Sequence, residues 1–212
     1  MAFEGPARDC GLCPRLAQFR ATNSTAYPDW HNAPVPSFGP LDGRLLIVGL
    51  APGLRGANRT GRPFTGDFAG DLLYPTIEAF GFGAGPFGAR PDDGFRMIAA
   101  RVTNAVRCVP PENKPTTAEI RACNPFLKAE IAAMPELRAV LALGLVAHKA
   151  VLQALGLVVA RYPFAHGAMH DLPSGPLLAD SYHCSRYNTN TGRLTEAMFH
   201  AVFADLRERL SG

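Results

Sequence analysis

Four of the chain's five cysteines form two pairs whose spacing suits metal binding. Cys10 and Cys13 lie in a C-x2-C turn rich in proline and glycine, and Cys108 and Cys123 follow much later in the chain. Two such pairs indicate a four-thiolate metal site, although free cysteines are also common as small core residues. Spacing alone does not separate zinc from an iron–sulfur cluster. Cys184 is predicted to be a free thiol near the site and not a ligand.

A glycine-rich segment is the second candidate for chemistry. The apolar run 44–50 leads into G-L-A-P-G (49–53) and then G-A-N-R-T-G-R-P-F-T-G-D (56–67). Such a turn after a strand can hold a phosphate, but this segment contains neither G-K-S/T nor G-x-G-x-x-G. The plainer interpretation is a tight connection. Asp67 ends this segment and Asp71 follows one helical turn later, and an aspartate in the position of Asp67 also commonly caps a helix.

Two further polar side chains follow buried segments. Asn104 lies at the end of an apolar run, where an unpaired amide is costly, and its carboxamide offers both a donor and an acceptor. The alternative is an asparagine bonded to nearby loop backbone. His183 lies in S-Y-H-C-S-R-Y-N-T-N-T-G-R-L-T (181–195), whereas the five other histidines lack such a context and are expected to be surface or structural residues.

The elements that position these residues alternate between strands and helices. Unbroken apolar runs, typical of parallel strands covered on both faces, span 44–50, 98–106, 138–143 and 176–182. Helices are expected at 68–80, after a Thr116/Glu119 capping box, at 145–155, and along the apolar stripe Leu194, Met198, Val202, Phe203, Leu206 and Leu210. Pro125 should kink or split the second of these helices.

This alternation predicts an α/β fold, a three-layer α/β/α sandwich with a central, mostly parallel four-stranded sheet. We expect one domain spanning residues 1–212, its N-terminal segment tied down by the metal site. Ligands of such sheets bind where loops leave the carboxyl ends of the strands, and the polar segments above lie at such ends.

Composition narrows the class only modestly. The chain is 47% hydrophobic and 18% charged, with no apolar run long enough to span a bilayer and no signal-peptide pattern, so a cytoplasmic location is expected. A net charge of +3 weakly favours a nucleic-acid partner. Only Lys114, Lys128 and Lys149 among the 21 basic residues are lysines, and the guanidinium groups of the rest suit phosphate.

Taken together, these motifs resemble the uracil-DNA glycosylase superfamily. The first motif region is G-L-A-P-G…G-R-P-F-T-G-D, the strand-end motif is T-N-A-V-R-C-V-P-P (103–111), and 181–195 resembles the motif usually written His-Pro-Ser. With the four cysteines, the resemblance runs from about Cys10 to Leu210. It is greatest to the iron–sulfur branch, type b (the fifth family). The resemblance implies a [4Fe-4S] cluster on Cys10, Cys13, Cys108 and Cys123.

The resemblance also implies roles for residues at the strand ends. An enzyme of this kind flips uracil, or a similar deaminated base such as hypoxanthine, out of single- or double-stranded DNA and hydrolyses its N-glycosidic bond. The implied base-binding residues are Gly49, Ala51, Phe64 as a stacking platform, and Asn104. The implied catalytic residues are Asp67 near the sugar, His183 as donor to the departing base, and Asn188 assisting in the same pocket.

Arginines near these motifs are expected to contact DNA. Arg59 and Arg62 flank one side of the expected pocket, and Arg186, Tyr187 and Arg193 the other; taken singly, each arginine would be read as a solvated surface residue. The sequence departs from the family at two points. Leu50 stands where fourth-family enzymes carry a glutamate, and Cys184 stands where a proline usually follows the histidine.

These features predict a monomeric, monofunctional glycosylase that uses water, because no lysine lies in a motif to act as a nucleophile. Because Leu50 replaces an acid, a second hypothesis remains open: a nucleic-acid-binding module that is cross-linked by a metal site and catalyses no reaction. A nucleosidase acting on free nucleosides is a third.

Overall fold

A five-stranded sheet forms the centre of the protein in a computed structural model, which describes residues 3–173 and 175–211. Its strands run in the order β4 (Ala100–Asn104), β1 (Leu45–Gly49), β5 (Ala139–Leu143), β7 (Leu177–Ser181) and β6 (Met169–His170). All neighbours are parallel except β6, which pairs antiparallel with β7. Two short antiparallel strands of two residues each, β2 (Gly83–Ala84) and β3 (Arg96–Met97), pair outside this sheet.

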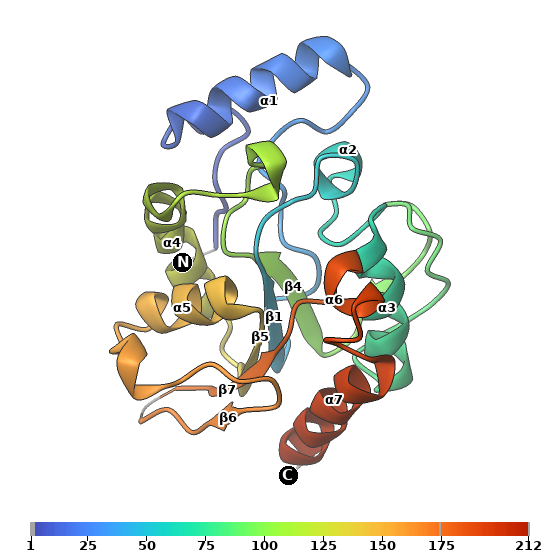
Figure 1. Cartoon of the computed structure of the whole chain (residues 1–212), viewed down its shortest axis with the longest axis vertical. Coiled ribbons are helices and arrows are strands. Elements are labelled where there is room, and N and C mark those ends of the chain that lie inside the picture. Colours follow the sequence, from blue (N-terminus) through green and yellow to red (C-terminus); the bar gives the residue numbers. More distant parts are fainter. Residues whose placement is uncertain (1–2, 174, 212) are drawn as a thin grey trace.

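Helices cover both faces of the sheet, as Figure 1 shows. Helices α3 (Phe68–Ala79) and α7 (Glu196–Ser211) lie on one face, and α4 (Thr117–Ala132) and α5 (Leu145–Ala154) on the other. Successive residues of β1 point to opposite faces, so Leu45 and Ile47 enter the first core while Leu46 and Val48 enter the second. The predicted α/β/α sandwich is therefore confirmed.

The structure differs from two details of the expected fold. The sheet has five strands, not four, because β6 is too short to give a hydrophobic pattern and pairs only at the edge. Pro125 was expected to kink or split α4, and the helix is not split but continues to Ala132. The ring of a proline removes one backbone hydrogen bond, and Pro125 lies on the exposed side of the helix, where water can satisfy the freed carbonyl group.

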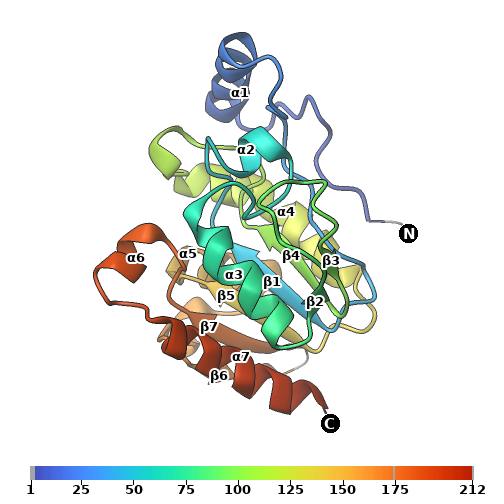
Figure 2. The same ribbon diagram turned by 90° about the vertical axis from the view of Figure 1, so that its right-hand side faces the viewer.

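Short helices follow the carboxyl ends of three strands: α2 (Ala57–Thr60) after β1, the 3-10 turn η1 (Pro111–Asn113) after β4, and α6 (Arg186–Asn190) after β7. A second 3-10 turn, η2 (Val159–Arg161), follows α5 and packs against it. A longer helix, α1 (Pro14–Ala26), starts directly after Cys13 and lies beyond the carboxyl ends of the strands (Figures 1 and 2). Within the described residues, no helix combines the length and apolar character needed to cross a membrane.

The strand order creates a crevice at one place. From β1 the chain moves to β4 on one side and then crosses to β5 on the other. The loops that leave β1 and β5 therefore diverge, and open α/β sheets bind ligands at such a switch point.

Candidate active site

A cleft of about 490 Å³ opens at this switch point. The loop after β1, the segment 143–146 at the end of β5, and the start of α3 contribute to its walls. His183, Ser185 and Arg186 close it from the end of β7. Gly144 has a φ of +95°, a backbone conformation that favours glycine, and it lies next to His183, since an added Cβ atom would be 3.5 Å from the Cβ atom of His183.

A smaller inner pocket of about 30 Å³ continues from the cleft. Its lining includes Phe64, Asp67, Asn104 and His183, which come from three separate segments of the chain: the glycine-rich loop, the end of β4 and the end of β7. The two cavities share Ala51, Gly53, Asp67, Ala69 and His183. The inner pocket has room for about one water molecule, so a ring that enters the protein must stay in the cleft. There it would meet Asp67 and His183, the polar residues that line both cavities.

The structure thus brings together most of the residues expected to bind or cleave a substrate. Gly49 lies beneath them, since an added Cβ atom would come within 2.5 Å of Asn104 Oδ1. Asn104 ends β4 and is buried. Gly144 after β5, Leu145 at the start of α5, and Asn113 of η1 were not predicted as lining residues. Gly144 directly after a predicted strand was the sequence signal that could have indicated the segment after β5.

Phe64 is held in an unusual conformation. Its φ of +53° is in the left-handed region, which is uncommon for residues other than glycine. Its ring stacks on the imidazole of His183, with centroids 5.9 Å apart and planes inclined by 28°. Phe64 is buried, and it lines the inner pocket.

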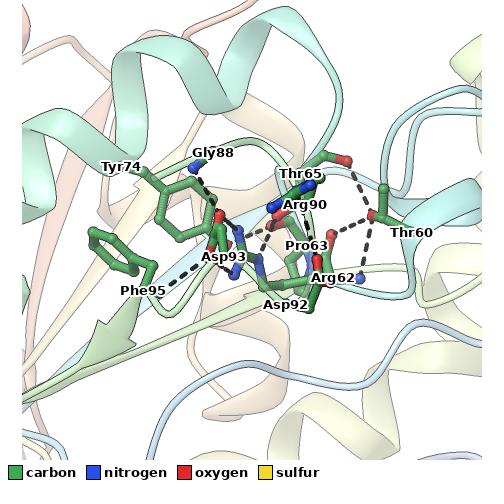
Figure 3. A network of polar contacts seen from close by, with 10 residues as sticks. All are labelled: Thr60, Arg62, Pro63, Thr65, Tyr74, Gly88, Arg90, Asp92, Asp93 and Phe95. Atoms are coloured by element: carbon green, nitrogen blue, oxygen red, sulfur yellow. Dashed lines mark hydrogen bonds and ion pairs between the residues drawn. The ribbon is translucent and has the colours of Figure 1, made fainter. Parts of the chain in front are cut away.

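Arg62 holds this loop in place from inside the protein, as Figure 3 shows. Its guanidinium donates to both carboxylate oxygens of Asp93 at 2.8 and 2.6 Å and, through Nε, to Thr65 Oγ1 at 2.7 Å. This pairing lowers the pKa of Asp93 well below its usual range. Arg62 was expected to contact DNA, but it is only 4% exposed and its guanidinium is occupied by Asp93, so the structure supports a role in holding the loop. The sequence could not show that Asp93 would neutralise it.

Asp67 occupies the N-cap position of α3, but its side chain makes no capping hydrogen bond. Its Oδ1 atom is buried without a hydrogen-bond partner among the described residues. Burial raises the pKa of this carboxyl above the ordinary value. Gly56 allows the close approach, because an added Cβ atom there would lie 2.8 Å from Asp67 Cγ. The arrangement leaves a carboxylate oxygen free for a ligand or water.

His183 is held through its backbone. Asn188 Nδ2 donates to the carbonyl oxygen of His183 at 2.8 Å, and no described residue bonds to the imidazole ring. Burial lowers the pKa of His183 to about 4, so the ring is neutral near pH 7 and carries one N–H donor. The neighbouring Cys184 is fully buried in the core, and burial raises the pKa of its thiol to about 12.

The other residues expected to contact DNA are exposed. Arg59 projects from α2, and Arg186 lies at the mouth of the cleft with its guanidinium 5.3 Å from the ring centroid of Phe68. Tyr187 is 71% exposed. The guanidinium of Arg193 lies 4.6 Å from the ring centroid of Tyr182. These groups are free to meet a partner that approaches the cleft.

The two cysteine pairs meet at a second site. Cys10, Cys13, Cys108 and Cys123 all line one small pocket between the N-terminal segment, α4 and the end of β4. Burial raises the pKa of Cys13, Cys108 and Cys123, to about 12 for Cys108, and the neighbouring thiols raise it further. The backbone N–H of Arg107 donates to Cys123 Sγ at 3.4 Å.

Sulfur spacing at this site suits a cluster better than one ion. Four thiolates at about 2.3 Å from a tetrahedral zinc lie about 3.8 Å from one another. Within the described part of the chain, no three cysteine sulfurs all lie within 4.8 Å of one another. A cubane spreads its thiolates over four separate irons, so the donor set fits a [4Fe-4S] cluster.

Comparison with known proteins agrees with this geometry. The family model described as the uracil DNA glycosylase superfamily matches residues 36–207. The chain belongs to the uracil-DNA glycosylase superfamily.

Relatives within this superfamily match over most of the chain. The Type-5 uracil-DNA glycosylase of Thermus thermophilus is 45% identical over 217 residues, which cover 100% of this chain and 98% of that protein. The Type-5 uracil-DNA glycosylase of Mycobacterium leprae is 42% identical, covering 94% and 90% of the two chains. A Type-4 uracil-DNA glycosylase from Pyrobaculum aerophilum is 36% identical over 150 residues, 70% of this chain and 62% of that one. The predicted resemblance to the type-5 branch of the uracil-DNA glycosylases is thus confirmed.

Proposed function

We propose that this protein removes uracil from DNA by hydrolysing the N-glycosidic bond and leaves an abasic site. The convergence of Asp67, Asn104, Phe64 and His183 on one pocket at the switch point carries the proposal. The matched relatives are named as glycosylases, which favours this function over a binding module without catalysis.

In this proposal the flipped base enters the cleft and presents its polar edge to the inner pocket. Asn104 Oδ1 accepts from N3–H of uracil and its amide donates to O4. Phe64 offers a ring face or edge to the base, and Gly49 and Ala51 leave the room that a larger side chain would fill.

Bond cleavage places negative charge on the departing base and positive charge on the sugar. A neutral His183 donates its N–H to the base O2 and stabilises the leaving anion. The unpartnered Oδ1 of Asp67 holds a water or faces the cationic sugar. Because Leu50 replaces the acid of the fourth family, Asp67 is the carboxylate that lines both cavities.

DNA would lie across the mouth of the cleft. Arg186 lines the cleft, and Arg59, Tyr187 and Arg193 are exposed on the segments that follow β1 and β7. Guanidinium groups grip phosphates, and the exposed ring of Tyr187 is suited to contact the bases next to the flipped nucleotide. We propose that the protein acts as a monomer in the cytoplasm, where its thiols remain reduced.

Cys10, Cys13, Cys108 and Cys123 would hold a [4Fe-4S] cluster. When bound, the cluster supplies a structural cross-link between the N-terminal segment, the loop after β4 and α4. About four irons per chain are expected in anaerobically purified protein. Cys108→Ala should lose iron and stability, whereas Cys184→Ala should keep its iron, since Cys184 lies in the core away from the cysteine pocket. Stoichiometric zinc without iron would contradict the cluster.

Release of free base from synthetic DNA tests the proposed activity. Oligonucleotides carry uracil, hypoxanthine or xanthine, either single-stranded or opposite each normal base, and free deoxyuridine serves as the small-molecule control. We expect uracil release from DNA and none from deoxyuridine. Binding to DNA without any base release would support the binding module, and cleavage of deoxyuridine alone would support a nucleosidase.

A further inference from the structure

The buried arginines of this chain differ in how their charge is balanced. Four arginines are buried: Arg20, Arg62, Arg101 and Arg107. Arg62 pairs with Asp93, and both Arg101 and Arg107 bond to Glu130. Among residues 3–173 and 175–211, no carboxylate forms an ion pair with Arg20. The charge of Arg20 is therefore the unbalanced one.

Arg20 is also short of one hydrogen bond. Its two terminal nitrogens donate to the carbonyl oxygens of Arg8 and Cys10, at 3.0 and 2.5 Å. Its Nε atom is buried and has no partner in the described part of the chain. The side chain is only 6% exposed. A buried guanidinium without an anion costs several kcal/mol, so this arrangement requires a negative partner.

The cysteine pocket lies next to this charge. Arg20 is on α1, which begins immediately after Cys13, and it holds the backbone of Cys10. Two other buried charged groups near the thiols are already paired, Glu119 with Arg15 and Arg107 with Glu130.

We propose that Arg20 is the counter-charge of the iron–sulfur cluster and that its free Nε–H donates to a cluster sulfur or ligating thiolate. The inference rests on the cluster proposed above. A cluster with four thiolates carries net negative charge, which supplies the anion that Arg20 lacks. Arg20 is then a positioning residue that retains the cluster and favours its more negative, reduced form.

Iron retention in anaerobically purified holoprotein tests the proposal. The rate of iron transfer to a ferrous-iron chelator is compared between the wild type and three variants. Arg20→Met removes the charge, Arg20→Lys keeps it, and Arg121→Met removes an exposed arginine two residues from Cys123 as the matched control. Loss of a group that supports metal ligands costs about 10–100-fold in metal affinity, so Arg20→Met should release iron faster by that order. Arg20→Lys keeps the charge but not the Nε–H donor, so it should release iron more slowly than Arg20→Met. Arg121→Met should stay close to the wild type.

The reduction potential gives a second readout. Voltammetry should find the cluster of Arg20→Met at a more negative potential than the wild type, with no shift for Arg121→Met. Iron release from Arg20→Met at the wild-type rate, or from Arg20→Lys as fast as from Arg20→Met, would overturn the proposal. If Arg20→Met does not accumulate as folded protein, Arg20→Lys is compared with the wild type: iron release faster by the full factor expected for loss of the group, about 10–100-fold, overturns the proposal, and a smaller increase supports it. A wild-type protein without iron would instead refute the cluster itself.

Discussion

Asn188 is bonded to the backbone of His183 and not to the pocket, with a distance of 2.8 Å between Asn188 Nδ2 and the carbonyl oxygen of His183. Asn188 was expected to assist catalysis in the pocket, and this contact gives it a positioning role. Asn188→Ala should slow uracil release about 10–100-fold, because small displacements of a catalytic group cost rates of that order. Asn190→Ala, an exposed residue of the same helix, should be unaffected. Equal single-turnover rates for the two variants would contradict the positioning role.

Asn104 is predicted to set base preference. In Asn104→Asp the donor to uracil O4 is replaced by an acceptor, so uracil release should fall and some cytosine release should appear. Oligonucleotides carrying either base, assayed with the same enzyme preparation, measure the change. A variant that still releases uracil at the wild-type rate would show that Asn104 has only a structural role.

Substitution of Arg62 should reduce folding stability, whereas substitution of Arg186 should weaken DNA binding. Arg62→Met leaves Asp93 buried without a partner, so the free energy of unfolding should fall by about 3–5 kcal/mol. Arg186→Ala should leave stability unchanged and reduce the slope of log K against log salt by about 1. Denaturant unfolding and DNA binding at several salt concentrations provide the two measurements. An unchanged salt slope in Arg186→Ala would remove Arg186 from the DNA contacts.

The carboxylate of Asp67 should lower the free energy of unfolding relative to a neutral side chain at the same position. Burial raises its pKa in the folded state, so the ionised carboxylate lowers stability at pH values above that pKa. Asp67→Asn should therefore be more stable near pH 7 by about 1 kcal/mol, or about 2–4 °C in Tm. This advantage should shrink as the pH falls through the raised pKa toward the value of the unfolded chain. A lower Tm for Asp67→Asn at pH 7 would show that the carboxylate stabilises the fold.

The activity of the wild type should follow the same group. Uracil release needs the ionised carboxylate, so it should fall as the pH drops through the raised pKa of Asp67, above the range of an ordinary aspartate. His183 remains neutral down to about pH 4. An acid limb that persists in His183→Ala belongs to Asp67, and one that disappears in that variant belongs to His183.

The sequence predicted those parts of the fold that repeat a pattern. Unbroken apolar runs located β1, β4, β5 and β7, and the three layers followed from their alternation with helices. Helix α1 was missed because it buries only Leu16 among its apolar residues, together with Arg20 and Asn23, and so has no apolar stripe. The edge strand β6 was missed because two residues cannot show alternation.

The sequence could not predict which side chains pair when they lie far apart along the chain. Motifs located Asp67, Asn104 and His183, because strand ends gather at one edge of a parallel sheet. Arg62 lies in the same motif and reads as a surface residue until Asp93 is known to face it from another loop. The sequence did not indicate a role for Arg20 for the same reason, because its burial and its lack of a carboxylate partner are visible only in the structure.

Single-turnover release of uracil from a duplex by wild type, Asp67→Asn, His183→Ala and the double variant tests the central claim most directly. Removal of one group that stabilises a developing charge costs about two to three decades in rate, so each single variant should lose at least that much while DNA binding is largely retained. The double variant should lose less than the product of the two, because Asp67 and His183 stabilise parts of one charge-separated transition state. If Asp67→Asn releases uracil nearly as fast as the wild type, Asp67 is not catalytic and the account is wrong.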